Sequence, residues 1–184
     1  MRKFVLIPIV SLGKQPQGHV LEIYSEPKLW GHADFQALKC CGLTTAVYEV
    51  ETVLQKLSNP KMSACHLYLG NYFLNLNGLK SLSLGLLLAG FMQKKSCHYH
   101  KIIVLGDLDR QQTHLPLISG TFFKTQLEAI LALDKQSHQV PLVLPIDKLP
   151  YKPDYLRERL KTLNIELMPV GNLFEALTQL GIVV

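Results

Sequence analysis

The chain has 184 residues, 48% of them hydrophobic and 18% charged, a composition that excludes an intrinsically disordered chain. Its length suits one domain spanning residues 1–184, with a core of its own, and leaves no room for an ATPase motor beside a catalytic domain. Nineteen Lys and Arg against fourteen Asp and Glu give a formal charge of +5. The basic residues are scattered rather than gathered in a stripe, so we do not expect a nucleic-acid surface.

The first residues, MRKFVLIPIVSLGK, have the charged start and the apolar stretch of a secretory signal. Pro8 interrupts that stretch and no small-residue cleavage site follows, so we expect a β-strand instead. No run approaches the roughly 18 apolar residues that a membrane span needs. The four cysteines lack the spacing of a disulfide framework, which indicates a reducing, cytoplasmic setting. Crowded Cys97, His98 and His100 do not match zinc-ligand spacing, and we expect neither a metal nor a cofactor.

The apolar pattern of the first half predicts strands, a connector and two helices. The expected strands cover residues 4–10, 19–24 and 65–69, and residues 72–76 lead into the turn dipeptide Asn77-Gly78. Helical periodicity covers residues 43–57, ended by Asn59-Pro60, and a helix buried on most sides is expected over residues 83–92. Trp30 lies in a connector whose apolar residues show no helical or strand periodicity. Two interpretations of Trp30 remain open: it anchors an interaction with a partner, or it fills the edge of the core.

The second half alternates strands with helices. Expected strands cover residues 101–105, 114–118, 140–146 and 165–168, and expected helices cover 122–133, 153–163 and 172–180. Proline opens the second of these helices and Asn172 caps the third. Early strands followed by this alternation predict a single compact α+β domain with a mixed β-sheet and packed helices.

Four short segments between residue 63 and the carboxyl end resemble a known family when taken in order. Ser83-Leu84-Gly85 opens the apolar helix, and residues 103–107 (IVLGD) are followed by 115–117 (LPL). Gly120, Lys124 and Ala129 share the third segment, and the fourth comprises residues 143–145 (VLP), 165–170 (IELMPV) and 175–177 (EAL). Together they resemble the proteolytic domain of Lon proteases, most strongly over residues 63–184. The resemblance implies a Lon-like fold, a polypeptide substrate or protein partner, and self-association.

The resemblance also implies a catalytic dyad, with Ser83 as the nucleophile and Lys124 as its base. A lysine is a base near pH 7 only as the neutral amine, which requires lowering its pKa from about 10.4 by roughly three units. Burial and a helix amino terminus both favour the neutral amine. Lys124 follows Phe122 and Phe123 at the start of an expected helix. Ser83 opens another, where free N–H groups would stabilise an oxyanion.

Simpler interpretations of the same polar residues remain open. Ser83 at a helix start is equally typical of an N-cap, which contributes about 1 kcal/mol. Asp107 and Asp109 follow a strand end, where sheets often carry functional groups, but a turn in which Asp107 hydrogen-bonds local backbone suits them as well. Ser81 would replace Ser83 as the nucleophile if the helix began earlier.

Two classes of function therefore remain. One is a Lon-like serine peptidase that uses Ser83 and Lys124 without an ATPase of its own. The other is a Lon-like domain without catalysis, which serves as a binding or assembly module in a larger complex. The presence of both Ser83 and Lys124 favours the peptidase. Lys80, standing where the family usually has an aspartate, and the missing GxxxxGK[ST] phosphate loop favour the module.

Overall fold

Alternating apolar residues at the amino terminus form a long hairpin at the middle of the sheet. The computed structural model describes residues 1–11, 15–57, 62–71, 82–146 and 153–182. In it β1 (Lys3–Ser11) pairs antiparallel with β2 (Gln17–Pro27). Val5, Ile7 and Ile9 turn to one face of the sheet and Leu6 to the other. Because both faces of β1 are apolar, helices can pack on both sides.

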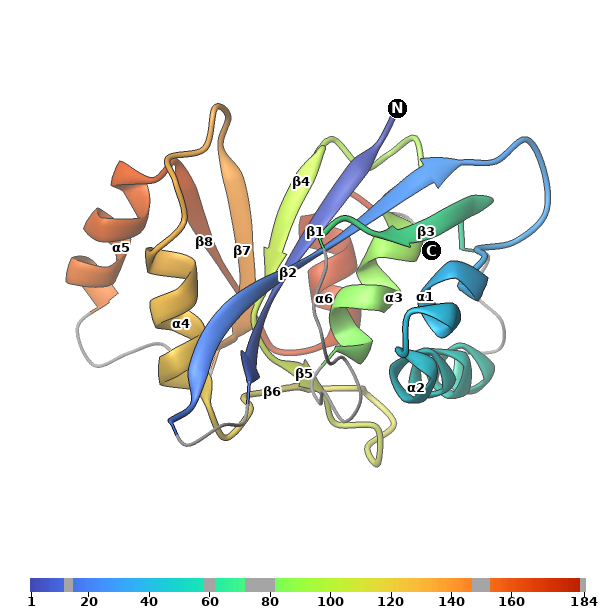
Figure 1. Ribbon diagram of the computed structural model, residues 1–184, viewed down its shortest axis with the longest axis horizontal. Coiled ribbons are helices and arrows are strands. Elements are labelled where there is room, and N and C mark those ends of the chain that lie inside the picture. Colours follow the sequence, from blue (N-terminus) through green and yellow to red (C-terminus); the bar gives the residue numbers. More distant parts are fainter. Residues whose placement is uncertain (12–14, 58–61, 72–81, 147–152, 183–184) are drawn as a thin grey trace.

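Six of the described strands form one mixed sheet in the order β3-β2-β1-β4-β7-β8 (Figure 1). β3 continues the antiparallel hairpin, whereas β1, β4, β7 and β8 run parallel. A separate two-stranded ribbon pairs β5 with β6. The bounds of these strands are β3 (Cys65–Leu69), β4 (Lys101–Val104), β5 (Asp107–Leu108), β6 (Leu117–Ile118), β7 (Val140–Pro145) and β8 (Ile165–Val170).

Helices cover both faces of the sheet (Figure 1). Two separate sets of buried side chains lie between these helices and the sheet. The larger core lies between the sheet and α1 (Gln36–Cys40), α2 (Thr44–Lys56), α3 (Ser83–Phe91) and α6 (Leu173–Gln179). The smaller core lies on the opposite face, under α4 (Phe123–Leu131) and α5 (Pro153–Thr162). The molecule is thus a single compact α+β domain with a mixed sheet, as the sequence predicts.

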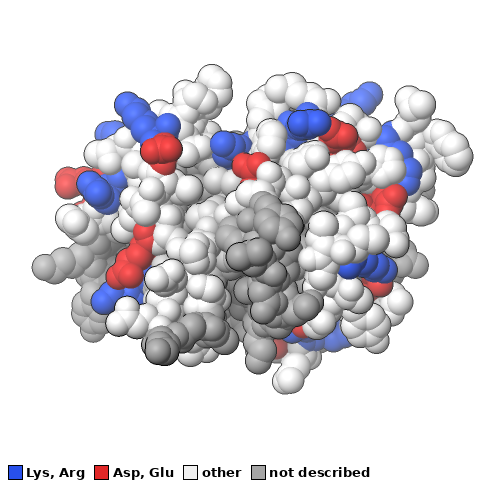
Figure 2. Space-filling view, in the orientation of Figure 1, with Lys and Arg blue, Asp and Glu red and all other residues white. Residues whose placement is uncertain are grey.

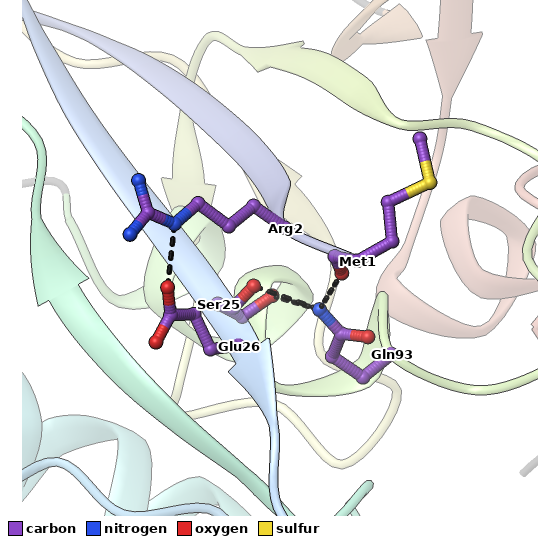
Figure 3. Close-up of polar contacts among 5 residues, drawn as sticks. All are labelled: Met1, Arg2, Ser25, Glu26 and Gln93. Atoms are coloured by element: carbon purple, nitrogen blue, oxygen red, sulfur yellow. Dashed lines mark hydrogen bonds and ion pairs between the residues drawn. The ribbon is translucent and has the colours of Figure 1, made fainter.

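α3 is the most deeply buried helix, and every residue from Ser83 to Phe91 is inaccessible to solvent or nearly so. Gly85 permits its close approach to β1, because a Cβ there would overlap the side chain of Ile7. Beyond the carboxyl end of α3, the Gln93 amide donates to the Ser25 carbonyl oxygen over 2.7 Å and to the Met1 carbonyl oxygen over 3.1 Å (Figure 3). These bonds fix the helix to β2 and to the beginning of the chain.

The expected elements are found, with three local differences. α1 was not expected; it is a five-residue helix with a single buried residue, too short to show a period. The strand expected over residues 114–118 is reduced to β6, because Leu115 has a φ of 46°, which no extended strand accommodates. β5 forms where the sequence indicated a turn at Gly106-Asp107. Expectations for residues 59–60, 72–78, 80 and 81 lie outside the described residues.

Charged side chains of both signs are interspersed over the face drawn in Figure 2. This agrees with the scattered Lys and Arg of the sequence. Among the described residues no helix is long and apolar enough to cross a membrane.

Candidate functional site

The amino terminus of α3 holds a buried serine and a buried aspartate in contact. Ser83 is 0% exposed and Asp107 is 7% exposed. The Ser83 hydroxyl donates a short hydrogen bond to the Asp107 carboxylate. The Leu84 backbone N–H points at the same carboxylate oxygen over 3.4 Å, a long contact. The carboxylate therefore lies against the positive end of the α3 dipole.

Asp107 reaches this position because β4 is followed by a glycine. Gly106 has a φ of +115°, and a Cβ at this position would lie 2.9 Å from the carbonyl oxygen of Ile118. Only glycine accommodates both conditions without strain. The turn brings the chain from β4 into β5, where Asp107 pairs with Ile118, and the Asp107 side chain lies under α3.

Ser83 does not accept a capping bond, contrary to the N-cap interpretation. Leu82 occupies the N-cap position of α3 and its side chain has no acceptor. Ser83 is the first helical residue, and its hydroxyl is a donor. The group that accepts from a helix-start N–H is Asp107, from a distant part of the chain. The turn interpretation, in which Asp107 hydrogen-bonds local backbone, is therefore wrong for Asp107, whereas Asp109 does accept from the nearby Gln111 N–H over 3.0 Å.

Lys124, the second expected site residue, is exposed at the start of α4. Its neighbour Phe123 packs on the sheet, as do Leu127 and Ile130, and Lys124 lies on the other flank of the helix. Among the described residues, no hydrogen bond or ion pair to the Lys124 side chain is found. Lys124 is thus an exposed residue and is not part of the buried contact at Ser83.

Ser83 and Lys124 nevertheless lie in the first turns of two helices that contact neighbouring residues of β1. Two residues after Ser83, Gly85 packs against Ile7; two residues after Lys124, the Gln126 amide donates to the Pro8 carbonyl oxygen over 2.8 Å. Ile7 and Pro8 are neighbours in β1, but α3 and α4 lie on opposite faces of the sheet. The structure places the two residues around the same part of β1 and does not join them.

The contact between Ser83 and Asp107 is a buried structural hydrogen bond. Both the Ser83 hydroxyl and the Asp107 carboxylate are buried, so neither is presented to a substrate in this arrangement. The nearest described helix-start N–H, that of Leu84, faces Asp107 rather than an open oxyanion position. The hydrogen bond from Ser83 to Asp107 attaches the first turn of α3 to the beginning of β5, directly after the Gly106 turn.

The described residues contain no cluster of three His, Cys, Asp or Glu side chains arranged to hold a metal ion. Apart from its position directly after a buried strand, no sequence signal identifies Asp107 as the partner of Ser83, since 24 residues separate them. Comparison with models of protein families found no match for the chain, and comparison with curated proteins found none either.

Proposed function

We propose that the chain is a Lon-like domain without peptidase activity, which serves as a protein-binding or assembly module in a larger complex. The observation that carries this proposal is the Ser83 hydroxyl, which is fully buried and donates to Asp107. A serine nucleophile has to present its oxygen to a substrate carbonyl with a base in reach of its proton. The Ser83 oxygen is buried, and the group in reach of its proton is the Asp107 carboxylate rather than the Lys124 amine.

The exposure of Lys124 supports the same proposal. Lys124 is exposed and is not hydrogen-bonded to Ser83, whereas a general base has to lie within hydrogen-bond reach of the proton that it accepts. Four free cysteines support a reducing, cytoplasmic environment for the module.

A Lon-like Ser–Lys peptidase is the second candidate, and one observation favours it. Ser83 and Lys124 both lie in the first turn of their helices, and the two helices contact neighbouring residues of β1, Ile7 and Pro8. A dyad would require Ser83 to release Asp107 and the Lys124 side chain to turn around the end of β1. Binding of a polypeptide in this region would have to stabilise that rearrangement.

Covalent labelling separates the two candidates. The wild-type chain, Ser83→Ala and Lys124→Ala are incubated with a fluorophosphonate probe, with and without an unfolded polypeptide, and adducts are mapped by mass spectrometry. An active Ser–Lys peptidase treated in parallel shows that the probe reacts. We expect no adduct at Ser83 in any sample and no cleavage of the polypeptide. A Ser83 adduct that disappears in Lys124→Ala would establish the peptidase and overturn the proposal.

A further inference from the structure

The loop between β2 and α1 holds two apolar side chains in solvent. Leu29 is 98% exposed and the neighbouring Trp30 is 80% exposed. This exposure excludes the interpretation that Trp30 fills the edge of the core. Single exposed apolar residues are ordinary on protein surfaces, but a fully exposed leucine beside the only tryptophan of the chain forms a concentrated apolar tip. We call residues 29–30 the Leu–Trp tip.

The backbone below the Leu–Trp tip is anchored on both sides to β3 and the residue before it. The Lys28 N–H donates to the Ala64 carbonyl oxygen over 2.9 Å, and the Asp34 N–H donates to that of Cys65 over 2.8 Å. The Leu67 N–H in turn donates to the Asp34 carbonyl oxygen over 3.0 Å. Both ends of the loop are therefore part of the folded structure. Much of the entropy cost of ordering the tip is already met before any partner binds.

The side chain of Asp34 closes the base of the same loop. One carboxylate oxygen accepts from the Gln36 N–H over 2.9 Å, and the other lies 3.1 Å from His66 Nδ1 and 3.9 Å from Lys28 Nζ. The pKa of Asp34 lies below its usual value, mainly because the Gln36 N–H donates to the carboxylate and to a smaller extent because His66 and Lys28 lie nearby. Asp34 is therefore a carboxylate at neutral pH, and the tip rises from a base that carries both signs of charge.

Mixed charge around an apolar centre favours a protein partner. A second ion pair, Arg2 to Glu26 at 2.5 Å, lies where β2 leads into the loop (Figure 3). Surfaces that bind nucleic acid or anionic lipid carry an excess of cations, and the described residues of this neighbourhood show none. Protein interfaces instead combine an apolar centre, often with Trp, and a polar rim of both signs.

We propose that the Leu–Trp tip is a self-association surface that contacts the same tip of a second copy across a two-fold axis. A two-fold interface brings one surface against itself, so opposite charges beside its centre become complementary. Lys28 of one copy can then face Asp34 of the second copy. The tip is small beside the roughly 800 Å² per partner of a standard interface, so the dimer is expected to be weak, with a dissociation constant of micromolar or above.

The single tryptophan gives a direct test. Trp30 fluorescence and its quenching by acrylamide are measured from about 1 μM to several hundred μM, the range expected for a weak interface, alongside sedimentation velocity. We expect dimer formation, a shift of the emission to shorter wavelength and loss of quenching along one concentration curve. A chain that stays monomeric, or a dimer in which Trp30 stays fully quenchable, overturns the proposal. A shift that requires anionic vesicles overturns it in favour of a membrane partner.

Two variants and a matched control locate the contact. Leu29→Ser keeps the fluorophore, and we expect it to raise the dissociation constant at least about tenfold, as for a residue at the centre of an interface. Lys28→Glu is expected to weaken association by placing carboxylates opposite one another. Tyr155→Ser, at a 68% exposed position on α5, is expected to leave the dimer unchanged. Equal weakening by Tyr155→Ser would contradict the assignment. Labelling at Ser83 has no bearing on this result, so this inference and the proposed function can fail separately.

Discussion

Removing the Ser83 hydroxyl should destabilise the fold, because its loss leaves a buried carboxylate short of donors. In Ser83→Ala the remaining described donor to Asp107 is the Leu84 N–H at 3.4 Å. Hydrogen bonds to charged groups contribute about 1.5–3 kcal/mol, so we expect the free energy of unfolding to fall by about 2 kcal/mol. For a domain of this size that corresponds to a decrease in Tm of roughly 4–8 °C.

A second buried serine supplies the matched control. Ser25 is 1% exposed, and its hydroxyl lies 3.2 Å from the neutral amide of Gln93. That amide also donates to the carbonyl oxygens of Ser25 and Met1, so Ser25→Ala strands no polar group and should cost about 1 kcal/mol or less. In an Asp107→Asn background the cost of Ser83→Ala should shrink by about 1 kcal/mol, which a double-mutant cycle measures.

Urea unfolding followed by far-UV circular dichroism is the assay for these variants, since Trp30 is too exposed to report on unfolding. A Ser83→Ala variant as stable as the wild type, or more stable, would contradict a stabilising role of the Ser83–Asp107 bond. Active-site residues are often retained at a cost in stability, so that outcome would favour a catalytic serine. A loss no larger than that of Ser25→Ala would likewise remove the special role of the Asp107 carboxylate.

Three further outcomes follow from the packing, the ion pairs and the thiols. Gly85→Ala should lower the free energy of unfolding by about 1–3 kcal/mol, because the added methyl group overlaps the side chain of Ile7. Thermal unfolding of the double variant Gly85→Ala/Ile7→Val should show that part of this stability is recovered. A Gly85→Ala chain more stable than wild type would contradict the close contact between α3 and β1. Because the pKa of Asp34 is lowered in the folded state, its stabilisation is present above about pH 4 and is lost as pH falls through the folded value. Because the Asp34 side chain is partly exposed, wild type should be more stable than Asp34→Asn by about 1 kcal/mol or less. This difference in the free energy of unfolding should shrink from pH 5 to pH 2. A difference that stays constant with pH would exclude the Asp34 carboxylate as its source. Burial raises the pKa of Cys65 to about 12, which leaves little reactive thiolate at neutral pH. Iodoacetamide should therefore modify the exposed Cys40 and Cys41 in the native chain, and the buried Cys65 and Cys97 only after unfolding. Rapid modification of Cys65 in the native chain would contradict its burial.

The elements with a strong local pattern are the ones that the sequence predicts well. The leucines after Ser83 are apolar on every side, which indicates a helix inside the core, and α3 is buried along its whole length. Residues 101–104 (KIIV) form β4 with its last three residues buried, as expected for a central parallel strand. Short elements escape this reasoning, since α1 buries only Leu38 and β6 is limited by the backbone of Leu115.

The site was predicted less well, because its main contact joins residues far apart in the sequence. The resemblance predicts both Ser83 as a site residue and Lys124 as its partner, whereas the helix start alone predicts an N-cap at Ser83. The spacing of Phe123, Leu127 and Ile130 already places the sheet-facing side of α4 away from Lys124. Asp107 is brought to Ser83 by the Gly106 turn, which depends on tertiary structure. Local patterns carry no information on such a pairing.

A crystal structure of the chain after treatment with a fluorophosphonate would decide whether the Ser83 hydroxyl stays bonded to Asp107 or acts as a nucleophile. We expect an unmodified Ser83, with its oxygen within about 3 Å of the Asp107 carboxylate, and the Lys124 side chain in solvent. A phosphonyl group on Ser83, with Lys124 Nζ within hydrogen-bonding distance of the Ser83 oxygen, would contradict this expectation.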